Sequence, residues 1–238
     1  MKKCYLLIAL FALVLVGPIA ASTKAVSFSV VANATQTEMD YLRQIAVLES
    51  TNALEKKYYE TVTVSYQVFQ YTLVYKSTSA TGTEVDHTAL VMFPDALGSF
   101  DTLVYNHGDM YLDADVPSKT KICSYQHYNV KSFSPTANPP HCNFMTSHAA
   151  RASFWASQGY IVIMPDFTGM GDSATTRTKI PPAYQAGLYK DAVINALDAL
   201  YSLSENDFPI AKTGRLLVGG FDEGGYATMA VQKALDTG

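Results

Sequence analysis

The spacing of apolar residues changes at about residue 100, and this change predicts two kinds of sheet. Residues 62–75 and 87–93 are rich in β-branched and aromatic side chains, and Gly82 lies in the turn between them. Strand-forming residues on both sides of a glycine turn are typical of an antiparallel hairpin. After residue 100, short apolar runs alternate with segments whose apolar residues recur every three or four positions. Such alternation predicts parallel strands with helices on both faces of the sheet.

The parallel part is predicted to contain strands at residues 102–106, 161–164 and 215–219. Residues 161–164 are apolar at every position, as in a strand that is buried on both faces. The predicted helices carry these apolar positions: Met145, Ala149, Ala152 and Ala156; Val193, Ala196, Leu197 and Leu200; and Ala227 with Met229. We expect one α/β domain over residues 61–238.

Residues 23–60 are predicted to be an N-terminal helical segment. Thr37 is the expected N-cap residue, and Met39, Leu42, Ile45 and Ala46 follow at helical spacing. The helix is expected to end near Ser50, or to continue to Lys57 with a break at residues 50–52.

Residues 1–22 have the features of a secretory signal peptide. Two lysines precede an apolar run over residues 5–16, and small residues follow up to Ser22. The apolar run is shorter than a bilayer span requires. We expect cleavage near Ala21 or Ser22, which also removes Cys4, and a soluble protein that is secreted or periplasmic.

The charge and the cysteine content of the sequence limit which partners, disulfides and metal sites are expected. The chain has 17 basic and 21 acidic residues and a formal net charge of −4, so neither nucleic acid nor an anionic membrane is an expected partner. Cys123 and Cys142 are predicted to form a disulfide that staples an irregular loop at residues 110–143. Two thiols beside His141 are a poor tetrahedral set, so we expect no metal, and the sequence indicates no cofactor.

Residues 216–225 read LLVGGFDEGG and carry the most chemical information. An apolar run ends at Gly220, and a helical pattern begins after Gly224 and Gly225. This is the layout of a nucleophile elbow, G-x-S-x-G, between a strand and a helix. The glycines permit a tight turn and a close approach of the neighbouring backbone. Asp222 stands at the tip, where a serine is expected.

The chain resembles the α/β-hydrolases and, within them, the secreted lipase and esterase branch. Four segments occur in matching order: the hairpin strand with Tyr75-Lys76-Ser77-Thr78, then Tyr105-Asn106-His107-Gly108-Asp109, then Pro165-Asp166-Phe167-Thr168-Gly169-Met170-Gly171-Asp172-Ser173, and finally Gly220-Phe221-Asp222-Glu223-Gly224-Gly225. The resemblance covers residues 62–238. It implies an α/β-hydrolase sheet that is incomplete after the elbow helix, and an ester or lipid-like small molecule as substrate.

The resemblance also assigns roles to residues of the elbow. Asp222 occupies the nucleophile position, and the backbone N–H groups of Asp109 and Glu223 form the oxyanion hole, with Gly108 beside them. These donors must point to where the negative oxygen of a tetrahedral intermediate forms. Three carboxylates around that position oppose its formation.

The general base is missing from its expected place. In this family the order along the chain is nucleophile, acid, histidine, whereas all five histidines here precede the elbow. His127 or His141 could in principle reach the site from the loop. Asp166 and Asp172 are candidate acids, which the family resemblance makes loop-structuring residues.

The sequence therefore favours an exported hydrolase-family protein that is inactive as it stands and has lost its serine. Two alternatives remain: a non-catalytic pseudo-hydrolase used for binding or structure, and a hydrolase that attacks epoxides or halides with Asp222. Family strand order also predicts that the strand from Arg215 to Gly219 is an exposed edge, open to self-association or a partner.

Overall fold

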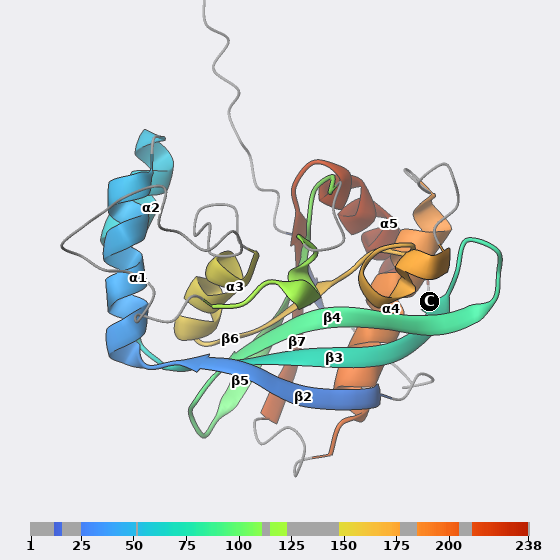
Figure 1. Ribbon diagram of the computed structural model, residues 1–238, viewed down its shortest axis with the longest axis horizontal. Helices are drawn as coiled ribbons and strands as arrows, with labels where there is room; N and C mark the ends of the chain where they lie inside the picture. The colour runs from blue at the N-terminus through green and yellow to red at the C-terminus, as the bar shows by residue number, and fades with distance from the viewer. Residues whose placement is uncertain are drawn as a thin grey trace, which may run out of the picture.

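The computed structural model describes residues 12–15, 25–50, 52–110, 115–122, 148–176, 185–204 and 211–237. Within these residues one sheet has the strand order β1-β7-β5-β6-β4-β3-β2 and is flanked by helices (Figure 1). The strands are β1 (Ala12–Leu15), β2 (Ala25–Ala34), β3 (Val68–Thr78), β4 (Glu84–Pro94), β5 (Ser99–Asn106), β6 (Tyr160–Pro165) and β7 (Ala211–Gly220). The helices are α1 (Gln36–Glu49), α2 (Ala53–Thr61), α3 (His148–Ser157), α4 (Ala186–Ser202) and α5 (Glu223–Thr237), with short 3-10 turns η1 (Pro117–Lys119) and η3 (Gly171–Thr176).

The strand pairing confirms the predicted fold class. β3 and β4 form an antiparallel hairpin, whose register runs from Val68 opposite Pro94 to Thr78 opposite Glu84. β4 also pairs with β6 in antiparallel fashion, whereas β5 pairs in parallel with both β6 and β7. The antiparallel hairpin therefore leads into a parallel part, as the change in apolar spacing predicts.

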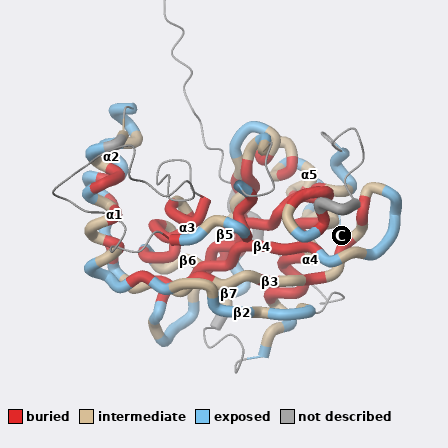
Figure 2. The backbone as a smooth tube through the Cα atoms, viewed as in Figure 1, coloured by how far each residue is buried: buried red, intermediate tan, exposed pale blue. Residues whose placement is uncertain are grey.

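Different helices bury the two faces of the sheet. In β6, Val162 and Met164 join the core under α1 and α3, whereas Ile161 and Ile163 join the core under α4 and α5. Side chains alternate between faces along a strand, so an entirely apolar strand must be covered on both sides. Figure 2 shows the result as buried segments that run through the central strands.

The N-terminal segment differs from the prediction of a helical segment at residues 23–60. Residues 25–34 form β2, which pairs antiparallel with β3, because their β-branched and aromatic residues can extend the hairpin sheet. The N-cap of α1 is Thr35 and not Thr37. The predicted break near residue 50 is present, since α1 ends at Glu49 and α2 begins after its own cap, Asn52.

The edge strand also differs from the prediction. The strand from Arg215 to Gly219 is not open, because β1 pairs with it antiparallel from Ala12 opposite Val218 to Leu15 opposite Arg215. An unpaired strand edge presents free N–H and C=O groups, and any short extended segment can satisfy them. Here the segment comes from the residues predicted as a signal peptide.

Among the described residues, no helix combines the length and the apolar character that a bilayer span requires.

Candidate active site

The chain turns sharply between β7, which ends at Gly220, and α5, which begins at Glu223. Asp222 lies at the tip with φ of 58°, and no other non-glycine residue of the described ranges has a positive φ. Holding such a residue in this conformation costs on the order of 1–3 kcal/mol, and residues of this kind concentrate at functional sites. The predicted strand, turn and helix are thus present, with Asp222 at the tip.

Close backbone contacts explain two of the glycines around this turn. A Cβ on Gly224 would lie 2.0 Å from the Asn106 carbonyl oxygen, and one on Gly220 would lie 2.2 Å from the Gly224 oxygen. The start of α5 therefore sits directly on the end of β5. A Cβ on Gly108 would come within 3.2 Å of the Asp222 Cβ, whereas Gly225 has room for one, with its nearest neighbour 4.0 Å away.

The backbone of Asp109 faces the side chain of Asp222. The Asp109 N–H donates to the Asp222 Oδ2 over 3.5 Å, which is a long hydrogen bond. Asp109 follows the end of β5, so the parallel pairing of β5 with β7 brings the two residues together. The donor that the family resemblance assigns to the oxyanion is therefore directed at a carboxylate of the protein itself.

A second carboxyl pair adjoins this contact. Burial, followed by a hydrogen bond to Asp109 and the charge of Asp109, raises the pKa of Glu223 to about 7. Two carboxyl groups can hydrogen-bond to each other only when one of them carries a proton. The hydroxyl of Tyr189, from α4, also donates to Glu223 Oε1. Glu223 therefore titrates near neutral pH while it is held from two sides.

His107 supports the turn but is not placed as a base for Asp222. Its Nδ1 lies 2.7 Å from the Gly108 carbonyl oxygen, which can only accept, so Nδ1 carries the hydrogen. Its ring lies 4.2 Å from that of Phe167, centroid to centroid, and burial lowers the pKa of His107 to about 4. Within the described ranges, no histidine hydrogen-bonds to Asp222.

A second buried histidine adjoins His107, and several predicted residues lie outside the described ranges. His148 lies 5.7 Å from His107, ring to ring, and burial lowers its pKa to about 3. His127, His141, Cys123 and Cys142 lie outside the described residues, so their predicted roles, including the disulfide, stay predictions.

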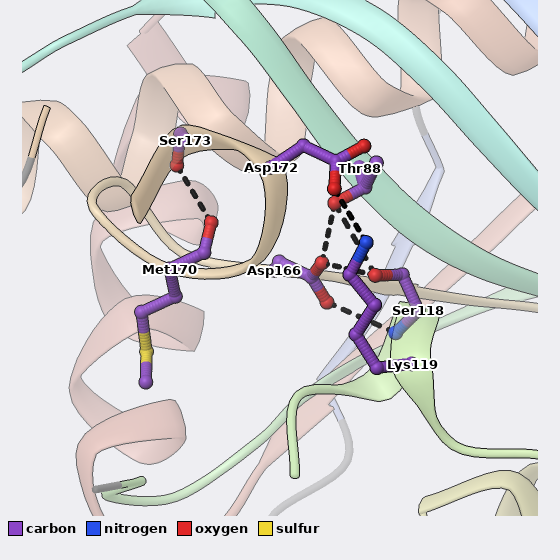
Figure 3. A network of polar contacts seen from close by, with 7 residues as sticks. All are labelled: Thr88, Ser118, Lys119, Asp166, Met170, Asp172 and Ser173. Atoms are coloured by element: carbon purple, nitrogen blue, oxygen red, sulfur yellow. Dashed lines mark hydrogen bonds and ion pairs between the residues drawn. The ribbon is translucent and has the colours of Figure 1, made fainter. Parts of the chain in front are cut away.

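Asp166 and Asp172 make loop-structuring contacts (Figure 3). The Asp166 carboxylate is buried and accepts hydrogen bonds from Ser118 and Thr88. Asp172 forms an ion pair with Lys119 at the surface.

Sequence reasoning did not find Tyr189, because the helical pattern of α4 marks it only as one more apolar position. Its contact with Glu223 spans 34 residues of the chain and arises from the packing of α4 on α5. In the part of the chain that the structure describes, no group of three or more histidine, cysteine or acidic side chains is arranged to hold a metal ion.

The fold is the α/β-hydrolase fold. The chain is similar to a solved structure from Legionella pneumophila that is described as a hydrolase. The match covers 90% of this chain and 48% of the Legionella chain, with 21% sequence identity and a TM-score of 0.65. The rice cell wall degrading esterase LipA from Xanthomonas oryzae matches 90% of this chain and 46% of its own, with 16% identity and a TM-score of 0.61. The chain thus spans about half the length of these structures. No protein-family model and no curated protein sequence matches it.

Proposed function

We propose that this chain is an exported protein of the carboxylic-ester hydrolase lineage that binds an ester or lipid-like small molecule but does not hydrolyse esters in its present form. The observation that carries this proposal is the contact between the Asp109 N–H and the Asp222 carboxylate. In an ester hydrolase this donor serves the substrate oxyanion, and loss of one such donor reduces kcat by roughly 10²–10³.

The charge at the turn supports the same conclusion. An oxyanion formed at Asp222 would lie among the carboxyl groups of Asp222, Asp109 and Glu223, and like charges raise the free energy of an anion. Attack of the Asp222 carboxylate on an ester would also give a mixed anhydride. The class of ligand, an ester or lipid-like molecule, rests on the resemblance to lipases and esterases, with the Xanthomonas oryzae esterase as the solved example.

Hydrolysis of p-nitrophenyl esters by the purified chain tests the proposal. We expect no turnover above the buffer rate, and none after Asp222→Ser alone. A serine needs a base within about 3 Å, and the histidine beside the turn, His107, is buried with its Nδ1 bonded to Gly108. Thermal unfolding of both proteins serves as the control for folding.

Turnover by the unmodified chain that disappears in Asp222→Asn would overturn this proposal. It would establish Asp222 as a nucleophile, and epoxides and haloalkanes would then be the substrates to compare. That chemistry attacks carbon and forms an alkyl-enzyme ester, so it does not need a stabilised carbonyl oxyanion.

The proposed export has a consequence for assembly. β1 lies within the predicted signal peptide, so its removal would uncover the edge of β7. We propose that a chain of residues 23–238 self-associates through Arg215 to Gly219, whereas the full chain does so less. Light scattering on both chains measures this difference, and equal masses would contradict it.

A further inference from the structure

Residues 115–122, here called the strap, cross the sheet next to β4 and β6. η1 lies within the strap and contacts both strands. Val116, Pro117, Ser118 and Ile122 of the strap are buried. The strap is therefore part of the folded core although it belongs to an irregular region of the sequence.

Two buried side chains hold the strap in place, and they differ in charge. Asp166 accepts from the Ser118 N–H at 3.1 Å through Oδ1, and from the hydroxyls of Ser118 and Thr88 through Oδ2 (Figure 3). Gln70 donates to the Thr120 carbonyl at 2.6 Å and accepts from the Ile122 N–H at 2.9 Å. The Gln70 anchor is neutral at every pH, whereas the Asp166 anchor can gain a proton.

Among the described residues no ion pair forms with the Asp166 carboxylate, although the charge of Lys119 acts on it and lowers its pKa. Lys119, on the strap, pairs with Asp172 of η3 at the surface. In the part of the chain that the structure describes, Tyr75 of β3 and His87 of β4 also face Asp166 from the packed elements. Burial raises the pKa of Tyr75 well above its usual value and lowers that of His87 to about 4, so both are neutral between pH 5 and 8.

Asp166 itself titrates inside that interval. Burial raises its pKa to about 6, although the donors from Ser118 and Thr88 act in the opposite direction. If the strap leaves, water reaches the carboxyl group and its pKa returns toward the ordinary value of about 3.9. The docked form therefore binds a proton more tightly than the undocked form. By linkage, docking of the strap becomes weaker as the pH rises.

We propose that the strap is a proton-dependent element, whose docking over Asp166 is favoured in acidic solution and weakened when the carboxylate ionises. The neutral carboxyl group keeps its contacts, because the hydroxyls of Ser118 and Thr88 can each donate or accept a hydrogen bond. The next residue, Phe167, packs against His107 at 4.2 Å and Tyr189 at 4.7 Å between ring centroids, so one residue separates Asp166 from a ring that contacts two side chains of the candidate site.

Amide hydrogen exchange on the full chain between pH 5 and 8, corrected for the intrinsic exchange rate, tests this inference. We expect the protection of the Ser118 and Ile122 amides to fall by about tenfold between pH 5 and 8, because a carboxyl group whose pKa changes from about 6 to about 3.9 on undocking changes the docking equilibrium by about that factor over this interval. Amides of α1 report on global stability and serve as the internal reference.

Three variants separate this mechanism from a general loss of structure. Asp166→Asn imitates the neutral form and should keep the strap protected at every pH. Asp172→Asn removes the surface ion pair, and Glu223→Gln removes the other carboxyl that titrates near neutral pH, so both should retain the wild-type pH profile. A wild-type profile that is flat or rises with pH overturns the proposal, even if Asp166→Asn does not fold. So does a wild-type pH dependence that persists in Asp166→Asn.

Discussion

Gly224 has no space for a side chain, because the Asn106 and His107 carbonyl oxygens lie 2.0 and 2.4 Å from the position of a Cβ. Both contacts are with backbone, which cannot move aside as a flexible side chain can. This single residue therefore sets how closely α5 approaches β5, and with it the distance between Asp222 and Asp109.

Gly224→Ala should lower the free energy of unfolding by roughly 1–3 kcal/mol or more, the usual cost of overpacking. Gly187 is the matched control: it lies in α4, it is exposed, and no atom lies within 4 Å of a Cβ built there. Gly187→Ala should leave the stability unchanged or raise it by about 0.4–1 kcal/mol. Urea unfolding of both variants measures the difference, and equal effects would contradict the close contact.

At the scale of elements, the start of α1 shows how local contacts fix a boundary. The Thr35 Oγ1 accepts from the Glu38 N–H at 3.2 Å, and the Glu38 carboxylate accepts from the Thr35 N–H at 2.8 Å. This reciprocal pair satisfies two N–H groups that the helix itself cannot. The sequence contains the same pattern, threonine followed three residues later by glutamate, but Thr37 precedes other acidic residues and competes with it.

Thr35→Ala should therefore cost about 1 kcal/mol of stability, the typical value for loss of an N-cap. Thr37→Ala should change stability by less than about 0.5 kcal/mol, because Thr37 is exposed within the first turn. Chemical unfolding of the two variants compares them directly. A larger effect at Thr37 would place the helix start where the sequence pattern first suggested.

At the scale of the whole molecule, buried ionisable groups set the response to acid. Burial lowers the pKa of His87 and His107 to about 4 and that of His148 to about 3. Each is neutral in the folded protein and protonated below about pH 6.5 when unfolded, so stability is lost as the pH falls from 6.5 to 4. The raised pKa values of Asp166 and Glu223 act in the opposite direction.

The three histidine shifts together exceed the two carboxyl shifts, so the melting temperature should fall between pH 6.5 and pH 4.5. His87→Phe keeps an aromatic ring beside Tyr75 and cannot be protonated, so it should make this fall less steep. Calorimetric melts of the two proteins at several pH values provide the measurement. A melting temperature that stays constant or rises on acidification would show that the buried carboxyls dominate.

The sequence determined the α/β class, because the period of its apolar residues depends only on local geometry. β6 and the turn around Asp222 could be predicted for the same reason. A continuous apolar run indicates a buried strand, and closely spaced glycines indicate a tight turn, whatever lies elsewhere in the chain. Residues 25–34 were not assigned to a strand, since β2 depends on the edge that β3 offers to it.

Only the tertiary structure decided which groups meet at the turn. The Asp109 N–H faces Asp222 because parallel pairing of β5 with β7 joins residues 113 positions apart. Tyr189 reaches Glu223 because α4 packs on α5, and β1 covers β7 although the sequence indicated an open edge there. Local patterns specify which element forms, whereas the partners of a side chain depend on how distant elements bury their apolar faces together.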